Sequence, residues 1–343
     1  MVAVVVPVYA VQEYVAAALE SVRAQTYPRW ECVVVDDGSP DDSAARAMAV
    51  VAGEPRMRLV RQANQGICGA RNRGLAELSA SVRFVCFLDS DDELCPTALA
   101  ELVAALEADP RAVGAYGYAE LIDEQGRVVG AGLHPARQRD RRRLAGRRLE
   151  PVGPAEPLTF AEAVVAGPIW PPAVALHRRE VVEGVGSFDP DLVQMEDWDL
   201  YLRMLRSGPF LALDRQVATY RFHPGQVTRR RSDVWYWKDV VRERTWRSPL
   251  NTPEQRRTAA RAWRQLHLRR TARVGQGLLR AVVRGDRPEA GRLGRGLLVL
   301  TRQALAAGPP AVTRREVELT HLDDDAAFLA ATGAAAPGPV PAG

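Results

Sequence analysis

Two carboxylates, Asp89 and Asp91, flank Ser90 directly after the apolar run 84–88. Residues two apart in an extended chain point the same way, so these carboxylates repel each other unless a cation lies between them or one is protonated. Mg²⁺ and Mn²⁺ prefer oxygen ligands and commonly bind one or two carboxylates together with substrate phosphates. The alternative is an acidic turn that caps the next helix. The position at the end of a buried strand favours the metal site.

A second acidic residue, Asp37, follows the apolar run 32–35. Its carboxylate is suited to accept a hydrogen bond from a nucleobase N–H. The alternative is a plain turn leading to a helix N-cap, but Asp41, Asp42 or Ser43 can cap that helix without Asp37.

The elements that must position these residues alternate along the chain. Short β-branched runs predict strands, and residues 15, 18, 19 and 22 have the spacing of an amphipathic helix. Such alternation predicts an α/β fold with a Rossmann-like, mostly parallel sheet flanked by helices, in which ligands bind at the carboxyl ends of the strands. The expected strands are 2–6, 32–35, 57–60 and 83–88, and the expected helices are 15–22, 43–51, 69–78 and 96–107.

The remainder of the chain is less regular. An Arg-rich stretch at 137–148 and a Pro-rich patch at 151–157 predict a mobile surface loop, and short helices are expected at 160–165 and near 197–205. The pattern from 253 to 305 is helical and basic. The tail from Gly333 onward is rich in Ala, Pro and Gly and is expected to be disordered.

Charge is unevenly distributed. Residues 1–130 carry 11 basic and 19 acidic residues, whereas the rest carries 35 and 23. Lys238 is the single lysine, so nearly every basic position is an arginine, as codon bias in a GC-rich genome would produce. The arginine excess therefore gives no ground for nucleic-acid binding. Four cysteines without a CxxC pair fit a reducing cytosol, and no run approaches the ~20 apolar residues that span a bilayer.

Five ordered segments together resemble glycosyltransferase family 2, the inverting group with the GT-A fold; they are 4–9, 19–28, 33–41, 64–74 and 87–93. The resemblance is dense over residues 2–110 and looser to about 225. It implies a hexosyltransferase-type enzyme of polysaccharide or glycoconjugate biosynthesis, with a nucleotide-sugar donor and a divalent metal, Mg²⁺ or Mn²⁺. Ala10 departs from the family, which often has Asn there.

The resemblance also implies roles for residues in 1–110, the part expected to bind the nucleotide sugar. Asp37 corresponds to the base-binding Asp, Arg71 to a basic residue beside the nucleotide, and Asp89 and Asp91 to the metal-binding pair, with Asp91 the more direct ligand. Ser90 lies within the same pair. Further donor contacts are expected from Pro7, Val8, Tyr9, Glu13, Asn64 and Gly69.

Residues 111–225 are expected to bind the acceptor and supply the catalytic base. Glu196 and Asp197 resemble the family's Glu-Asp motif, in which Asp197 removes the proton from the acceptor hydroxyl. The alternative is that two acids merely open a helix, and both can hold. His223 is a candidate third metal ligand beside Asp89 and Asp91. Trp198 is a candidate sugar-stacking residue.

Three other functions are compared with an inverting transferase that uses a UDP- or dTDP-sugar. A sugar nucleotidyltransferase needs a Gly-rich basic loop after the first strand, and a dehydrogenase needs G-x-G-x-x-G; neither is present. A noncatalytic carbohydrate- or nucleotide-binding protein is disfavoured by the retention of Asp89, Asp91 and Asp197.

The sequence does not indicate which sugar is transferred. The acceptor also stays open, and the alternatives are a sugar, a lipid-linked molecule and a small molecule. For the basic helices of region 226–332 the alternatives are packing on the catalytic domain, homodimerisation, or peripheral contact with the inner face of an anionic membrane by a cytoplasmic protein. Residues 333–343 form the expected disordered tail.

Overall fold

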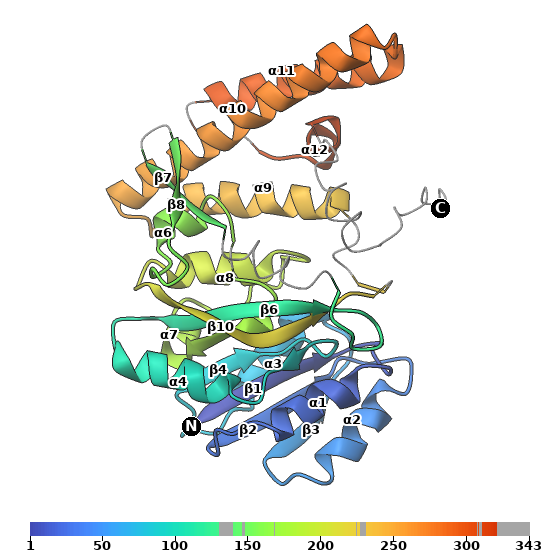
Figure 1. Cartoon of the computed structure of the whole chain (residues 1–343), viewed down its shortest axis with the longest axis vertical. Coiled ribbons are helices and arrows are strands. Elements are labelled where there is room, and N and C mark those ends of the chain that lie inside the picture. The colour runs from blue at the N-terminus through green and yellow to red at the C-terminus, as the bar shows by residue number, and fades with distance from the viewer. Residues whose placement is uncertain are drawn as a thin grey trace.

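The protein is described here from a computed structural model. It covers residues 1–129, 140–145, 148–167, 169–223, 225–226, 231–306, 308 and 311–320. Figure 1 shows a sheet with its flanking helices at one end of the molecule and a stack of long helices at the other. The predicted tail 333–343 lies outside the described residues.

Eight strands form one sheet in the order β3-β2-β1-β4-β9-β6-β10-β5. The first four strands are parallel neighbours, β3 (Met57–Arg61), β2 (Trp30–Asp36), β1 (Val2–Val8) and β4 (Phe84–Phe87). Every residue of β1, β2 and β4 is buried, which explains their continuous apolar sequences. All four predicted strands are confirmed, and their carboxyl ends lie at one edge.

The second half of the sheet is mixed. Strand β9 (Ala175–Arg178) is antiparallel to both β4 and β6 (Gly114–Ile122). Strand β6 pairs in parallel with β10 (Phe210–Arg221), and the two-residue β5 (Glu93–Leu94) closes the edge antiparallel to β10. Because β9 reverses direction between them, β4 and β6 run the same way.

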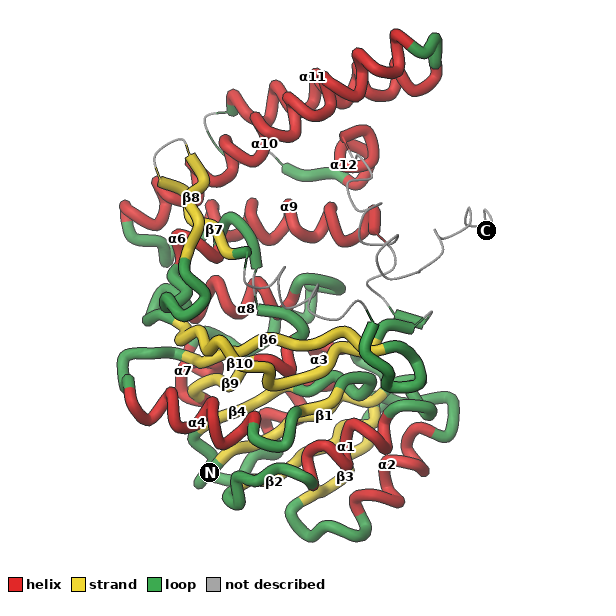
Figure 2. The backbone as a smooth tube through the Cα atoms, in the orientation of Figure 1, coloured by secondary structure: helices red, strands yellow, loops and turns green. Residues whose placement is uncertain are grey.

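Helices cover both faces of the sheet (Figure 2). Helices α1 (Val15–Arg23) and α2 (Ser43–Val51) pack together, and Gln25 after α1 is hydrogen-bonded to residues at the start of α4 (Ala98–Ala108). On the other side α3 (Gly66–Ala76) packs on β1 and β2, and α7 (Arg179–Gly184) packs on β9 and on α8 (Glu196–Met204). The four helices predicted in residues 1–110 are confirmed, with ends shifted by a few residues.

The expected surface loop at 137–157 is wrong in part. Strands β7 (Arg141–Ala145) and β8 (Arg148–Val152) form a separate two-stranded antiparallel sheet. Arg141 anchors it, because its buried guanidinium donates to both carboxylate oxygens of Glu162 at 2.6 and 2.9 Å, in helix α6 (Phe160–Ala163). A buried ion pair with a partner 21 residues away outweighs the loop-like composition.

The C-terminal region is helical, as predicted, and consists of α9 (Arg231–Arg247), α10 (Pro253–Val283), α11 (Arg287–Leu305) and α12 (Arg314–Thr320). Helices α10 and α11 form an antiparallel hairpin, while α9 packs against α8, α10 and α12. A short 3₁₀ turn, η1 (Pro172–Val174), precedes β9. Within the described residues, no helix is both long enough and apolar enough to cross a bilayer.

The packing of α3 on β1 is sensitive to one glycine. A Cβ atom at Gly74 would lie 2.3 Å from Cγ1 of the fully buried Val5. We therefore expect Gly74→Ala to lower the free energy of unfolding by about 1–3 kcal/mol, because α3 or β1 must shift. Urea unfolding measures this. The matched control Gly294→Ala, in α11, meets nothing within 4 Å and should gain about 0.5–1 kcal/mol. Equal stability of the two variants would contradict the close-packing argument.

Candidate active site

Most of the predicted site residues gather where the parallel strands end. Strands β2, β1 and β4 are adjacent, so the loops that follow them, with Asp37, Tyr9 and Asp89, leave the same edge of the sheet. Helix α8 begins beside this edge, as the hydrogen bond between Arg71 and Glu196 shows. The expected convergence of the motif residues is therefore observed.

A buried arginine joins three parts of the chain. Arg71, in α3, is 1% exposed, and its two terminal nitrogens donate at 2.6 Å to Asp89 Oδ1 and to Glu196 Oε1. Asp89 follows β4 and Glu196 is the first residue of α8. The guanidinium fits this task because its planar fork presents several fixed donors to two carboxylates at once.

This arrangement gives Arg71 a role that the sequence did not indicate. The side chain is enclosed and both terminal nitrogens are bonded to carboxylates, while its expected place beside the nucleotide stays a prediction. Its positive charge lowers the pKa of Asp89, although burial outweighs it and raises that pKa overall. Arg71 is a positioning residue that allows several acids to lie close together.

Asp197 is the next acid along α8 and has a strongly perturbed pKa. Burial and the neighbouring charge of Glu196 raise the pKa of Asp197 to about 7, against the opposing effect of Arg71. Met195, which precedes the helix, has a φ of 63°, in the left-handed region that non-glycine residues rarely adopt. A carboxyl group with a pKa near neutrality can exchange a proton at physiological pH.

Asp91 and His223 form a second polar pair. The imidazole Nε2 lies 3.0 Å from Asp91 Oδ2, and the imidazole ring packs against Tyr14 with centroids 4.7 Å apart. Among the residues that the structure describes, no group of three His, Cys, Asp or Glu side chains could hold a metal. Asp89, the third expected ligand, donates no oxygen to this pair and instead accepts from Arg71 through Oδ1, so the three-ligand set stays a prediction.

The sequence analysis missed Arg221, which holds the loop carrying Asp91. Its backbone N–H donates to Asp92 Oδ1 at 3.0 Å, and its guanidinium donates to Asp91 O at 3.0 Å and pairs with Glu93. The same guanidinium reaches the carbonyl oxygens of Asp123 and Glu124. Arg221 lies two residues before His223 at the end of a strand, and that period-2 spacing was the available signal.

Asp37 is 3% exposed and is fixed by the loop after β3. Its Oδ1 accepts hydrogen bonds at 2.8 Å from the Gln62 side chain and from the backbone N–H of Gln65. Neither glutamine was predicted. Asn64 is exposed and accepts a hydrogen bond from the Gly66 N–H. Gly69 leaves room for the Gln65 side chain, because a Cβ atom added at Gly69 would lie 2.5 Å from the Cβ of Gln65. These contacts order the loop beside Asp37.

The other predicted residues differ in exposure. Pro7 and Val8 are buried within β1, Ser90 is 5% exposed, and Tyr9 is half exposed beside the site. Glu13 is exposed and lies 3.9 Å from Arg46. Trp198 is a correction: its indole is 4% exposed, donates to the carbonyl of Ala163 and is covered by Arg242, so it packs in the core and presents no face to a sugar.

Comparison with known proteins points to one family. Residues 3–151 match the family described as Glycosyl transferase family 2. The chain is 27% identical over 230 residues to EpsJ of Bacillus subtilis, covering 66% of this chain and 63% of that protein. It is 30% identical over 230 residues to alr2836 of Nostoc, covering 65% of each. Both are named uncharacterized glycosyltransferases, and the chain spans less than two thirds of each.

Solved structures share the fold. S. aureus TarS 1-349 superimposes with a TM-score of 0.57 at 16% identity, covering 89% of this chain and 80% of that one. The mannosyltransferase PcManGT from Pyrobaculum calidifontis gives a TM-score of 0.55 at 20% identity, covering 89% and 86%. Likeness at these identities establishes the GT-A-like fold.

The charge balance around Arg71 generates a prediction about pH. In Arg71→Met, the pKa values of Asp89 and Asp197 rise further above those of the unfolded chain, so the folded state binds extra protons. Stability should then fall more steeply with rising pH than in the wild type, with a loss of about 3–5 kcal/mol at pH 8 that shrinks toward pH 5. Urea unfolding across this range measures it.

Arg73→Met, on the same helix, is the matched control. Arg73 is exposed and pairs with Glu77 on the surface, so its removal should change stability little and without pH dependence. An Arg71→Met protein whose stability follows the wild-type pH curve would refute the assigned role.

Proposed function

Because the chain carries a glycosyl transferase family 2 domain, we propose that it is a glycosyltransferase that moves a sugar from a nucleotide-diphosphate donor to an acceptor hydroxyl with inversion. The observation that carries this proposal is the group formed by Arg71, Asp89 and Glu196, with Asp197 beside it at a pKa of about 7. A carboxyl group with a pKa near neutrality beside such a cluster favours an enzyme over a noncatalytic binding protein.

The donor is assigned to residues 1–110, with UDP- or dTDP-sugar as the expected class. Asp37, fixed by Gln62 and Gln65 at the end of β2, is the proposed acceptor for the nucleobase N–H, and the half-exposed Tyr9 follows the neighbouring strand β1. Support comes from the TarS 1-349 fold match, which is solved with UDP-GlcNAc. PcManGT is solved with GDP-Man and Mn²⁺, so the fold itself admits more than one nucleotide.

A divalent ion is proposed at Asp91 and His223. The carboxylate oxygen and imidazole nitrogen, 3.0 Å apart, are a donor pair that Mn²⁺ or Mg²⁺ accepts, and a bound diphosphate supplies further oxygens. When bound, such an ion offsets the charge of the leaving diphosphate. Arg221 keeps the loop of Asp91 in place through its bonds to Asp91 O and Asp92.

Asp197 is proposed as the general base. The acceptor oxygen attacks the anomeric carbon as its proton passes to the Asp197 carboxylate, and the bond from that carbon to the diphosphate oxygen breaks. A base with a pKa near the working pH is largely deprotonated and still basic enough to take the proton from the acceptor hydroxyl. Arg71 limits the rise of that pKa and holds Glu196, while residues 111–225 would form the acceptor side.

Substituting the proposed base separates chemistry from binding. Asp197→Asn should lower the transfer rate by about 10²–10⁴-fold and leave donor affinity within a few-fold, because the amide cannot accept the proton. Radiolabelled sugar transfer measures the rate, and Mn²⁺-dependent thermal shifts with UDP- and dTDP-sugars measure donor binding. Asp91→Asn is the matched comparison and should weaken the Mn²⁺-dependent shift. Undiminished transfer by Asp197→Asn would overturn the base assignment, and no shift with any nucleotide would favour a noncatalytic protein.

The rate of transfer should depend on pH through Asp197. Because its pKa is raised to about 7, the base is protonated in acid, and turnover should fall about tenfold per pH unit below about pH 6 and level off above pH 8. Initial rates at saturating donor and metal from pH 5 to 9 test this. The residual rate of Asp197→Asn should lack this acid limb. A wild-type profile that is flat down to pH 5 would exclude Asp197 as the titrating base.

A further inference from the structure

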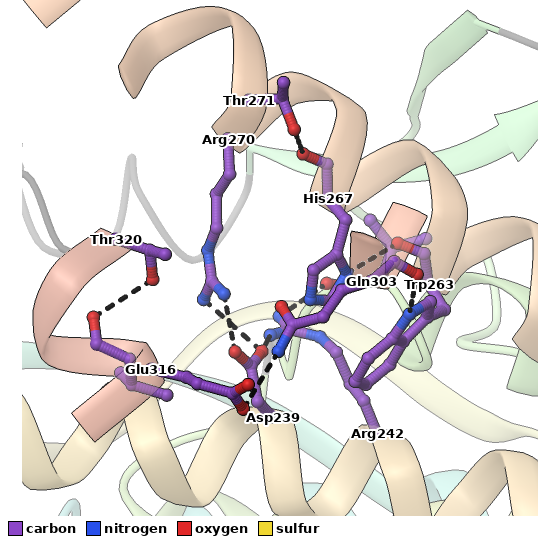
Figure 3. A network of polar contacts seen from close by, with 11 residues as sticks. Asp239, Arg242, Trp263, His267, Arg270, Thr271, Gln303, Glu316 and Thr320 are labelled. Carbon is purple, nitrogen blue, oxygen red and sulfur yellow. Dashed lines mark hydrogen bonds and ion pairs between the residues drawn. The ribbon is translucent and has the colours of Figure 1, made fainter. Parts of the chain in front are cut away.

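The α10–α11 hairpin is fixed to the rest of the protein at its base. Asp239 of α9 is 2% exposed and accepts from Arg242 at 3.0 Å and from Arg270 of α10 at 2.5 Å (Figure 3). Arg242 in turn donates to the carbonyl of Val165 in the catalytic part. A buried carboxylate shared by two guanidinium groups resists rearrangement, so the direction of α10 is set.

The inner face of the hairpin is already occupied. Trp263 of α10 donates to the carbonyl of Gln303 in α11 at 3.2 Å, and farther out a small core of its own joins the two helices. That core contains Val274, Ala281, Leu293 and Leu300. The apolar residues that this packing leaves outside have no role in holding the hairpin together.

The far end of the hairpin exposes three large apolar side chains. Leu279 is 65% exposed, Val282 60% and Val283 79%. They are three and four residues apart on the last turns of α10, so they lie on one face. We call this surface, with the turn that follows, the hairpin tip (residues 279–287). Leu268, 52% exposed and three turns earlier on the same face, extends the apolar stripe.

Arginines surround these apolar residues. Arg280, Arg284 and Arg287 are exposed within the hairpin tip, against one acidic residue, Asp286. The wider hairpin, residues 253–305, has 13 arginines and 3 acidic residues, a net charge of +10. Exposed apolar groups beside basic groups on a helix are the pattern of surfaces that bind anionic membranes, where the apolar groups enter the acyl boundary and the arginines meet phosphates.

We propose that the hairpin tip docks on an anionic lipid surface. Charge complementarity selects this occupant: a second copy of the chain would set one arginine-rich tip against another, whereas an anionic bilayer satisfies both the arginines and the apolar side chains. In Figure 1 the hairpin tip lies at the end of the molecule opposite the sheet and projects away from it.

Vesicle co-sedimentation of the full chain tests the proposal. The chain should bind vesicles of phosphatidylglycerol and phosphatidylethanolamine and dissociate from them at high salt. It should not bind vesicles of phosphatidylcholine alone. The double variant Arg280→Glu/Arg284→Glu should lower the partition coefficient about thirtyfold or more, given about 1 kcal/mol per basic residue near the surface. Leu279→Glu/Val283→Glu should abolish binding, because carboxylates replace the inserting side chains.

Matched controls lie outside the hairpin tip. Leu250 is 74% exposed and the Arg111 side chain 86% exposed, so Leu250→Glu and Arg111→Glu make the same changes elsewhere and should bind as the wild type. Thermal unfolding and donor binding of all variants should match the wild type, since every altered side chain is exposed.

Wild-type protein that stays in solution with anionic vesicles at low salt would overturn the proposal, as would control variants that lose binding equally. Multi-angle light scattering gives the remaining decisive outcome. A dimer that Leu279→Glu/Val283→Glu converts to a monomer, with vesicle binding unchanged, would identify a second copy as the occupant.

Discussion

One buried guanidinium determines how the site is assembled. Arg71 binds the carboxylate that follows β4 and the carboxylate that opens α8, so three segments distant in the sequence meet at a single side chain. Acids gathered this closely repel each other, and a cation among them costs less than leaving them unpaired. The raised pKa of Asp197 is the net result of these opposing effects. Burial and the charge of Glu196 raise this pKa, and the charge of Arg71 lowers it. The same interaction thus limits the pKa of Asp197 and joins the two halves of the site.

The sequence allowed the sheet and the meeting of its motifs to be predicted, because buried parallel strands have an unmistakable apolar pattern and their carboxyl ends share an edge. The sequence did not indicate which charged side chains form ion pairs and hydrogen bonds with one another. The partners of Arg71 are 18 and 125 residues away, and those of Arg221 reach 130, so no local spacing indicates them. The β7–β8 sheet was missed for the same reason, since Arg141 finds its buried partner in another element.

Backbone conformation was also hidden from the sequence. Ala10, directly after Tyr9, has a φ of 53°, and Met195, directly before Glu196, has a φ of 63°. Neither is a glycine or asparagine, so neither residue type announces a left-handed conformation, and at Ala10 the departure from the family's Asn removed the usual signal. Both positions adjoin the site, where surrounding contacts can hold a strained backbone in place.

Strand β9 has a consequence for how the chain must be made. It lies between β4 and β6, yet it is residues 175–178, long after both neighbours in the sequence. During synthesis from the N-terminus, β4 therefore waits with an open edge while about ninety further residues emerge, at the rate of ~5–20 residues per second. An unpaired apolar edge strand is a template for association with other chains. A premature stop anywhere before residue 175 leaves that edge permanently open, so truncated chains cannot complete the sheet and are prone to associate with other chains.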